Sequence, residues 1–481
     1  MAAAEIGPLA QSGGLGDVLR ALPHALARLG HAVRRFMPAY GSVNRAGFIR
    51  EEMNLAVPLG PARVPVTFLS RAEPSGSGPG GVMTTLVEND ELFAREGIYG
   101  PPGGAYDDNA RRFSLLSRAV CEYARSSGSS PHVLHVHDWH TAIVPLLTRF
   151  AVAWPGRPPV TVLTIHNMGY QGRFGPEDLD WLSLPPGERE RLLRGNGIED
   201  HGGMNFLKAG IVHADRVVAV SPTYAREIAT PEGGFGLDAI LRRRSADVVG
   251  ILNGADYDVW NPETDRHLPR PYGPGSLAAK DESRRALRQA IGLPSGDRPM
   301  LGVVSRLVEQ KGIDLVARAA HDLLEMGADL AILGSGEATI AEALERSRAA
   351  RPDRVGLRIG YDEGLSHLII AGCDLLLMPS RYEPCGLAQM HAMRYGTVPV
   401  VRRTGGLADT IRDEGGAPGD GTGFVFDDAS AEALAGAVRR ALALRRSDPQ
   451  AWRDLQLRAM REDFSWDAAA ARYEEIYEGR P

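Results

Sequence analysis

The sequence of 481 residues predicts an α/β fold made of two doubly wound, Rossmann-like domains. Short apolar runs alternate with helical patterns along the whole chain, which is typical of parallel sheets covered by helices. A glycine-rich phrase also occurs once in each half of the chain. The length and the 43% hydrophobic content allow two or three domains with buried cores.

The apolar runs mark the expected strands. In the first half these are residues 32–37, 132–136, 160–165, 216–220 and 248–252. In the second half they are residues 300–304, 330–333, 355–359, 374–378 and 397–401. A doubly wound domain should open with an apolar strand, yet only six residues precede Gly7. The first strand is therefore either shortened or begins upstream of Met1.

Two helices are marked by apolar residues at helical spacing. The first follows Gly14 and should end at Gly30, with no more than a kink at Pro23. The last is expected over residues 466–478, where Ser465 can cap it.

Residues 260–265 and a Pro- and Gly-rich run at residues 269–275 indicate a hinge region between the two halves. We therefore expect an N-terminal domain over residues 1–258, a C-terminal domain over residues 259–460 and a final helical segment over residues 461–481.

The repeated phrase reads Gln-Ser-Gly-Gly-Leu-Gly-Asp at residues 11–17 and Arg-Thr-Gly-Gly-Leu-Ala-Asp at residues 403–409. Paired glycines let the backbone approach a ligand closely, and a following helix offers unpaired N–H groups and partial positive charge. Two copies favour a phosphate-bearing ligand, although an ordinary strand-to-helix turn would use the same residues.

The formal net charge of −6 argues against a nucleic-acid or membrane-surface partner. No segment resembles a signal peptide or reaches the roughly 18 apolar residues of a membrane span. Cys121, Cys373 and Cys385 are too few and too widely spaced for a disulfide framework. These features favour a cytoplasmic protein.

Only Lys208, Lys280 and Lys311 are lysines among the 54 basic residues. A lysine that persists in such a composition indicates a position that needs a compact point charge. Chance remains an adequate explanation for Lys280, which lies in a polar run.

Polar residues directly follow several predicted strands, where open α/β sheets bind ligands. Asp138 and His166 follow strands of the first half. Arg306 and Lys311 follow a strand of the second half and could neutralise one diphosphate without Mg²⁺, unless they form only a surface pair. Glu383 lies in a turn that should present its carboxylate at a helix N-terminus, where its alternative role is a helix cap.

Several other kinds of site lack support. His135, His137 and His140 lie close in sequence, but no carboxylate or cysteine cluster completes a metal site. The sequence has no nucleophile elbow, Walker loop or complete dinucleotide fingerprint, so hydrolase, NTPase and dehydrogenase functions are not indicated.

Motifs along nearly the whole chain resemble the family of bacterial glycogen synthases and plant starch synthases. The matching segments are residues 12–18, 137–140, 164–167, 206–210, 220–224, 252–254, 304–307, 310–312, 359–361, 379–387 and 403–409. The resemblance implies the GT-B fold, in which two Rossmann-like domains face each other across a cleft and the last helix crosses back to the first domain. It also implies transfer of glucose from ADP-glucose to the non-reducing end of an α-1,4-glucan, such as glycogen, with retention of configuration.

The resemblance assigns catalytic roles to three residues: Glu383 nearest the transferred sugar, His166 by the anomeric centre and Asp138 on the acceptor or sugar side of the cleft. The implied donor-binding residues are Gln11, Gly13, Gly14, Asn253, Arg306, Lys311, Tyr361, Cys385, Gly386, Leu387, Thr404, Gly405 and Gly406. Because fixed cations and a helix N-terminus would stabilise the diphosphate, no metal or other cofactor is expected. Retention ordinarily uses a carboxylate nucleophile. A front-face displacement is commonly inferred for this family, so Glu383 is assigned an electrostatic and orienting role.

The chain departs from the family at Gln11, where the first glycine loop of the family opens with a lysine. Two alternatives therefore stand beside glycogen synthesis. One is another retaining GT-B enzyme with a different donor or a small acceptor. The other is a weakly active glucan-binding protein, which Gln11 and the short first strand would suit.

Overall fold

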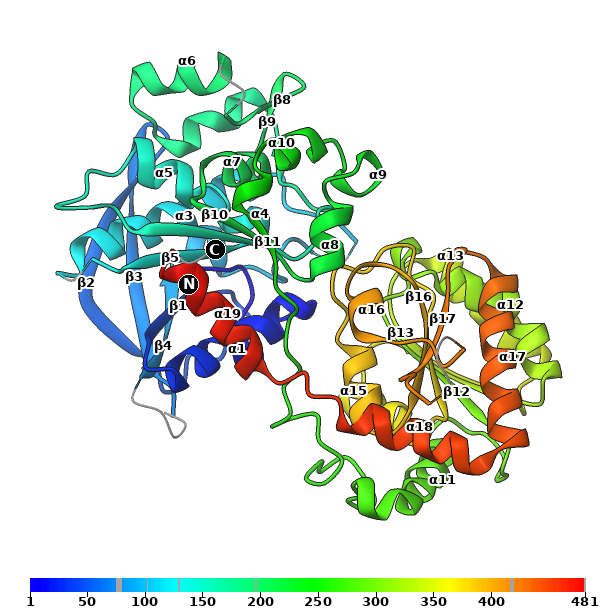
Figure 1. The fold of residues 1–481 in the computed structure, drawn as a ribbon. Helices are drawn as coiled ribbons and strands as arrows, with labels where there is room; N and C mark the ends of the chain where they lie inside the picture. Colours follow the sequence, from blue (N-terminus) through cyan, green and yellow to red (C-terminus); the bar gives the residue numbers. More distant parts are fainter. Residues whose placement is uncertain (75–79, 102, 129, 195–196, 416–418, 480–481) are drawn as a thin grey trace. The chain divides into compact units, whose positions relative to one another are not determined.

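The computed structural model describes residues 1–74, 80–101, 103–128, 130–194, 197–415 and 419–479. The chain divides into two compact α/β units (Figure 1). Unit 1 comprises Met1–Gly254 and Trp466–Pro481, and unit 2 comprises Ala255–Ser465. These divisions lie a few residues from the boundaries expected at 258/259 and 460/461.

Unit 2 contains a parallel sheet in the order β14-β13-β12-β15-β16-β17. The strands are β12 (Met300–Val304), β13 (Asp329–Gly334), β14 (Val355–Ile359), β15 (Leu375–Met378), β16 (Val398–Arg402) and β17 (Phe424–Phe426). The strand order reverses between β12 and β15, which is where a doubly wound sheet opens a ligand crevice.

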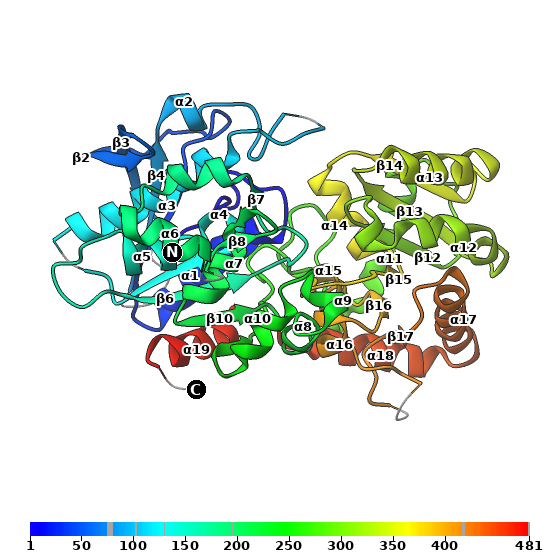
Figure 2. The same cartoon turned by 90° about the horizontal axis from the view of Figure 1, so that it is seen from above.

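Helices cover both faces of this sheet (Figure 2) because side chains along each strand alternate in direction. Leu301 and Val303 pack with one helix layer, whereas Met300 packs with the other. The helices of unit 2 are α11 (Lys280–Ala290), α12 (Ile313–Glu325), α13 (Ala338–Ala350), α14 (Glu363–Gly372), α15 (Ala388–Arg394), α16 (Gly405–Thr410), α17 (Ala431–Ser447) and α18 (Pro449–Arg461), with 3₁₀ turns η3 (Pro274–Ala279) and η4 (Glu309–Lys311). The predicted doubly wound architecture is confirmed here.

Unit 1 has two groups of strands, ordered β1-β4-β3-β2 and β11-β10-β6-β5. The strands are β1 (Ala32–Pro38), β2 (Ile49–Leu59), β3 (Ala62–Ala72), β4 (Gly81–Glu88), β5 (Val133–His137), β6 (Val160–Ile165), β10 (Arg216–Ala219) and β11 (Val248–Gly250). The Ala2 N–H donates to His135 O at 2.9 Å, and the Ala3 N–H donates to Phe36 O at 3.1 Å. The short segment before Gly7 thus joins the two groups and occupies the position of the first strand.

The first and last helices pack together within unit 1. Helix α1 (Gly14–Arg28) continues through Pro23 and lies beside α19 (Trp466–Tyr477), as Figure 1 shows. Leu15, Leu22, Trp466 and Tyr473 belong to one buried cluster. The other helices of unit 1 are α2 (Asp90–Phe93), α3 (Asn109–Ser126), α4 (Asp138–Thr141), α5 (Val144–Phe150), α6 (Pro186–Arg194), α7 (Phe206–His213), α8 (Pro222–Glu227), α9 (Pro231–Gly234) and α10 (Asp238–Arg243), with 3₁₀ turns η1 (Pro176–Leu182) and η2 (Ser245–Asp247).

Some strands carry no clear signal in the sequence. Strands β2 and β3 are antiparallel and half exposed, so their residues alternate in burial and do not form an apolar run. Strand β17 and the small sheet of β7 (Arg173–Phe174), β8 (Glu199–Asp200) and β9 (Gly203–Asn205) are too short to show a period. Among the described residues, no helix combines the length and apolar character needed to cross a membrane.

Candidate active site

The C-terminal ends of β12 and β15 bring an ion pair of half-buried Lys311 and buried Glu383 to the switch point of unit 2. The Nζ of Lys311, at the end of η4, lies 2.5 Å from Glu383 Oε2. The Ser380 hydroxyl donates to the same oxygen at 3.0 Å. Glu383 is only 4% exposed, and exposed Arg306 follows the same strand as Lys311. A fixed carboxylate and two cations therefore belong to the part of the sheet where ligands bind.

Gly312 allows Lys311 to reach Glu383. It has a φ of 65°, and a Cβ at this position would overlap the carbonyl oxygen of Pro379. Only glycine adopts this positive φ without strain and leaves room for the Pro379 carbonyl oxygen. The loops after β12 and β15 can therefore come into backbone contact.

The second glycine loop packs against the segment that carries Glu383. Gly405 has a φ of 42°, and a Cβ there would overlap Glu383 O. A Cβ on Gly406 would overlap Cys385 O, and the Gly406 N–H donates to Glu383 O at 3.1 Å. This amide was expected to face a phosphate, but it is engaged inside the protein.

The helix after Glu383 begins later than the sequence suggests. Leu387 is the N-cap of α15, which starts at Ala388, so the prediction that Glu383 lies at a helix N-terminus is wrong, and Glu383 is not a cap. Buried Cys385 and Gly386, which has a φ of 72°, form the intervening turn. The Gln389 side chain holds this turn by donating to both of their carbonyl oxygens.

Two further predicted donor residues of unit 2 lie on other loops. Tyr361 follows β14 and is 87% exposed, so its ring is accessible for stacking. Thr404 is the buried N-cap of α16, next to Gly405.

In unit 1, Asp138 has an unusual backbone conformation at the end of β5. Its φ is 55°, a strained value for a residue other than glycine and one found preferentially at functional sites. Its Oδ1 accepts the His166 N–H at 2.7 Å and the Asn167 N–H at 3.4 Å. Burial raises the pKa of Asp138 to about 7, although these hydrogen bonds oppose the shift. The carboxyl group thus fixes the strand end that presents His166.

A chain of buried histidines lies behind His166. His137 Nδ1 and His166 Nε2 are 3.0 Å apart, and the rings of His135 and His137 are separated by 4.1 Å. Burial lowers the pKa of His166 to about 3 and the pKa values of His135 and His137 well below the usual range. The rings are therefore neutral, and one of the bonded nitrogens of His137 and His166 must carry the proton.

The histidines considered for a metal site have other partners. Both nitrogens of His135 are hydrogen bonded at 2.7 Å, to the hydroxyls of Tyr477 and Thr164. The ring of His140 stacks on Tyr99 at 4.7 Å. His135 would have to break a hydrogen bond to bind a metal.

The first glycine loop surrounds a carboxylate of its own chain. Glu5 is 3% exposed, and its Oε2 accepts the Ser12 N–H at 2.7 Å and the Gly13 N–H at 3.2 Å. The Ser12 hydroxyl donates to Glu5 Oε1 at 2.6 Å, and the Tyr99 hydroxyl donates to the same atom. An internal anion thus takes the amides expected to bind a ligand.

Gln11, at the start of this loop, is exposed, and its Nε2 donates to Gly13 O at 3.2 Å. Gly14 is the first residue of α1. Asn253 is 5% exposed, and its Oδ1 is buried with no hydrogen-bond partner among the described residues. An unsatisfied buried acceptor costs free energy, which marks Asn253 as a candidate ligand contact.

Sequence reasoning missed Glu5 and Ser380, and it misjudged Lys280. The sequence does contain a sign that Glu5 has a specific role, because it is the one charged residue in the apolar segment before the loop. Lys280 is buried, and its Nζ donates to Ala371 O at 2.6 Å and to Tyr395 O at 3.2 Å. Chance does not explain Lys280, because its ammonium ties α11 to the rest of unit 2.

Two α/β units, each with polar residues at the C-terminal ends of its parallel strands, are consistent with a glycosyltransferase of the GT-B fold. Residues 1–243 match the family described as starch synthase catalytic domain, and residues 283–454 match glycosyl transferases group 1. The chain therefore belongs to the family of glycogen and starch synthases, as the sequence motifs predict.

Known relatives cover nearly the whole chain. Glycogen synthase from Anaeromyxobacter sp. (strain Fw109-5) is 45% identical over 99% of this chain and 98% of its own length. Glycogen synthase 1 from Methylococcus capsulatus is 45% identical over 98% of this chain and 94% of its own.

Solved structures agree with the sequence relatives. The catalytic domain of starch synthase IV from Arabidopsis thaliana, bound to ADP and acarbose, has a TM-score of 0.90 and 35% identity, covering 99% of this chain and 98% of that chain. Sucrose-phosphate synthase from Thermosynechococcus elongatus, at 21% identity and a TM-score of 0.58, shares the fold.

Proposed function

We propose that this glycosyltransferase moves a glucosyl group from ADP-glucose to the non-reducing end of an α-1,4-glucan such as glycogen, with retention. The observation that carries this proposal is the ion pair of Lys311 with the buried Glu383 carboxylate at the switch point of unit 2. Full-length relatives named glycogen synthase, and a related starch synthase solved with ADP and acarbose, support the choice of donor and acceptor.

The reaction breaks the bond between glucose C1 and the diphosphate oxygen and forms a bond from C1 to the acceptor hydroxyl oxygen. The hydroxyl proton leaves with the departing ADP. Arg306 and Lys311 would stabilise the growing negative charge of the diphosphate. Glu383 would offset the positive charge at the sugar while it holds Lys311 in place.

The remaining predicted contacts complete the proposal. In unit 1, His166 and Asp138 would act near the sugar and acceptor, and Asn253 would contact the donor through its unsatisfied Oδ1. In unit 2, Tyr361 would stack on the nucleotide base. The other proposed donor contacts are Gln11, Gly13, Gly14, Cys385, Gly386, Leu387, Thr404, Gly405 and Gly406.

We also propose that the reaction needs no metal, since Arg306 and Lys311 provide the charge that Mg²⁺ would otherwise supply. Turnover should be unchanged after EDTA treatment and after addition of Mg²⁺ or Mn²⁺. Loss of turnover on chelation, restored by either ion, would contradict this.

The decisive experiment incubates the purified protein with glycogen and either ADP-glucose or UDP-glucose, and measures nucleotide release and glucose incorporation. We expect ADP-glucose to be used, and NMR of the product to show new α-1,4 linkages. Transfer from UDP-glucose alone, or to a small sugar only, would indicate a different GT-B enzyme. Glycogen binding without transfer from either donor would indicate a glucan-binding protein.

We also propose that the protein works in the cytoplasm, apart from membranes and nucleic acids. Its cysteines are free and buried, which suits a reducing compartment. Cell fractionation with immunodetection tests the location, and recovery in a membrane or secreted fraction would contradict it.

A further inference from the structure

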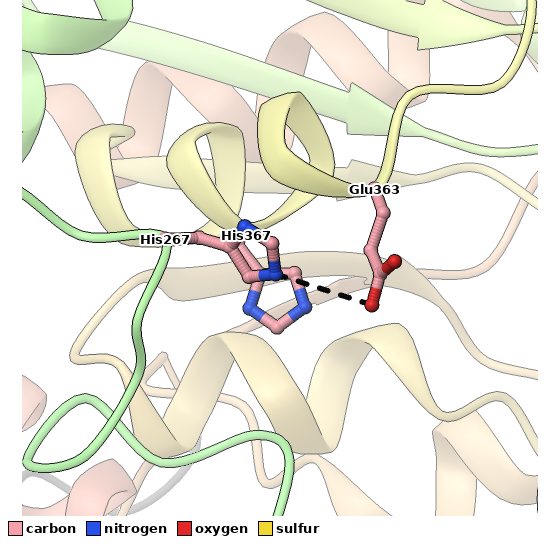
Figure 3. Close-up of side chains that lie close together, drawn as sticks. All are labelled: His267, Glu363 and His367. Atoms are coloured by element: carbon pink, nitrogen blue, oxygen red, sulfur yellow. Dashed lines mark ion pairs between the residues drawn. The ribbon is translucent and has the colours of Figure 1, made fainter.

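We propose that His267, Glu363 and His367 of unit 2 form a binding site for one Zn²⁺ ion, separate from the transfer reaction. One potential ligand atom from each residue lies within 4.8 Å of the others (Figure 3). Glu363 and His367 are four residues apart on α14, a spacing that places two side chains on one helix face. His267 reaches them from the segment before η3.

Asp265 fixes the orientation of His367. The Nδ1 of His367 lies 2.7 Å from Asp265 Oδ2, and the Tyr395 hydroxyl donates to the same oxygen at 2.6 Å. The bond to the carboxylate places the His367 proton on Nδ1 and leaves Nε2 as the metal-binding nitrogen. A carboxylate behind a histidine ligand is the usual outer partner in zinc sites, where it raises ligand basicity.

Stacked rings restrict the movement of His367 further. The ring of Trp260 stacks on the ring of His367 with a centroid distance of 3.8 Å. Trp260 also stacks on His391, with a centroid distance of 4.2 Å. His367 itself is 1% exposed. Since the ring is already ordered, it loses little freedom when it binds an ion.

The other two residues are more accessible. His267 Nε2 lies 4.0 Å from Glu363 Oε1, and the Glu363 side chain is 50% exposed. A rotation of this exposed side chain can bring its carboxylate closer to both imidazoles, and His267, whose side chain is 24% exposed, can move toward the fixed ring of His367. The separations can then approach the roughly 3.3 Å expected between ligands that each lie about 2.0–2.1 Å from zinc. The fourth position remains open to water.

The ligand types select the metal. Two imidazoles and one carboxylate suit Zn²⁺ and neighbouring transition ions, whereas Mg²⁺ and Ca²⁺ prefer oxygen ligands. None of the three residues is among the proposed donor-binding or catalytic residues, so the ion is assigned no role in the proposed chemistry. Its effect should be to tie the start of α14 to the segment that contains His267.

The test is a Zn²⁺ titration of the intact, reduced protein after chelator treatment, with Co²⁺ absorption as a second probe. We expect one equivalent to bind, tetrahedral Co²⁺ bands to appear and Tm to rise with zinc concentration. Because Trp260 stacks on His367, zinc should also change tryptophan emission, and Trp260→Phe should reduce that change while binding persists.

Variants assign the ligands. His267→Gln and Glu363→Gln should each weaken Zn²⁺ binding at least about 10-fold, and Asp265→Asn should weaken it about 10–100-fold through His367. His321→Gln and Glu325→Gln, exposed positions on α12, should bind as the unaltered protein does. No binding at 100-fold excess zinc over protein, or unchanged binding in both His267→Gln and Glu363→Gln, would overturn the proposal. Mg²⁺ binding with equal affinity would overturn it as well.

Discussion

The two glycine loops share Gly-Gly-Leu and a final aspartate, yet the structure uses them differently. In unit 1 the amides of the loop at residues 11–17 surround the Glu5 carboxylate. In unit 2 the loop at residues 403–409 lies with its backbone against residues 383–385. One loop holds an internal anion, and the other holds the segment that carries the proposed catalytic carboxylate.

This difference shows what a repeated glycine phrase does and does not indicate. It indicates close approach to the backbone, because only glycine leaves that space open. It does not identify the approaching group, which in unit 1 is a side chain and in unit 2 is another backbone segment. A ligand-binding role for either loop therefore needs its own test.

The largest expected effect is on the second loop. Gly405→Ala should destabilise unit 2 by about 3 kcal/mol or more, because it combines a positive φ with overlap at Glu383 O. Gly13→Ala is the matched control, since nothing lies within 4 Å of its added Cβ, and it should cost less than about 1 kcal/mol. Urea unfolding measures both, and equal costs would remove the distinction between the loops.

Glu383→Ala tests the role of the carboxylate in the segment that the second loop packs against. It should leave ADP-glucose binding largely intact but lower kcat by at least about 10²-fold, because the charge acts chiefly in the transition state. Ser380→Ala, which removes one hydrogen bond to the same oxygen, should have a smaller effect. Steady-state kinetics with glycogen provide the measurement, and near-normal turnover of Glu383→Ala would exclude it from the mechanism.

Glu5→Gln tests the internal anion of the first loop. Loss of the charge weakens three hydrogen bonds from Ser12 and Gly13 and should reduce stability by about 1–3 kcal/mol. Glu52→Gln, at an exposed position on β2, should change stability by less than about 0.5 kcal/mol. Thermal unfolding that shifts equally in both variants would show that Glu5 does not hold the loop.

Gln11→Lys tests whether the first loop still approaches the donor. A hydrogen bond from the lysine ammonium to the donor should be about 1–2 kcal/mol stronger than one from the neutral glutamine amide. The value of kcat/KM for ADP-glucose should therefore rise about 5- to 30-fold. Gln11→Met, of similar length but uncharged, should give no increase. A neutral or harmful Gln11→Lys would place this exposed side chain away from the donor and favour the glucan-binding alternative.

The smallest effect concerns the pH dependence of stability at Asp138. Burial raises the pKa of Asp138 from 3.8 in the unfolded chain to about 7 in the folded protein. Its contribution to the free energy of unfolding is therefore fully present below about pH 4, where the carboxyl group is protonated in both states. That contribution is lost as the pH rises toward 7. Asp138→Asn cannot ionise, so its Tm relative to the unaltered protein should rise by a few degrees between pH 5 and pH 8. A constant difference would contradict the shift.

Much of this architecture could be predicted because parallel strands are buried on both sides and read as apolar runs. The same regularity placed Asp138, His166, Arg306 and Lys311 at strand ends. The contact of Lys311 with Glu383 could not be predicted, since it depends on how two loops meet across 72 positions of sequence.

Other features could not be predicted from the sequence, each for a local reason. The half-exposed strands β2 and β3 look polar in sequence, and the amide of Gly406 is engaged by a segment that its own sequence does not reveal. The cluster of His267, Glu363 and His367 joins residues from a loop and a helix, so no spacing rule marks it.

The packing of α19 against α1 also has a consequence for synthesis on the ribosome. Unit 1 includes Trp466–Pro481, which are translated only after all of Ala255–Ser465. At about 5–20 residues per second, the intervening stretch takes on the order of 10–40 s to make. During that interval the apolar face of α1 that later meets Trp466 and Tyr473 has no partner. The nascent N-terminal unit is therefore open to chaperones, whereas unit 2 is continuous in sequence and can fold as soon as it emerges.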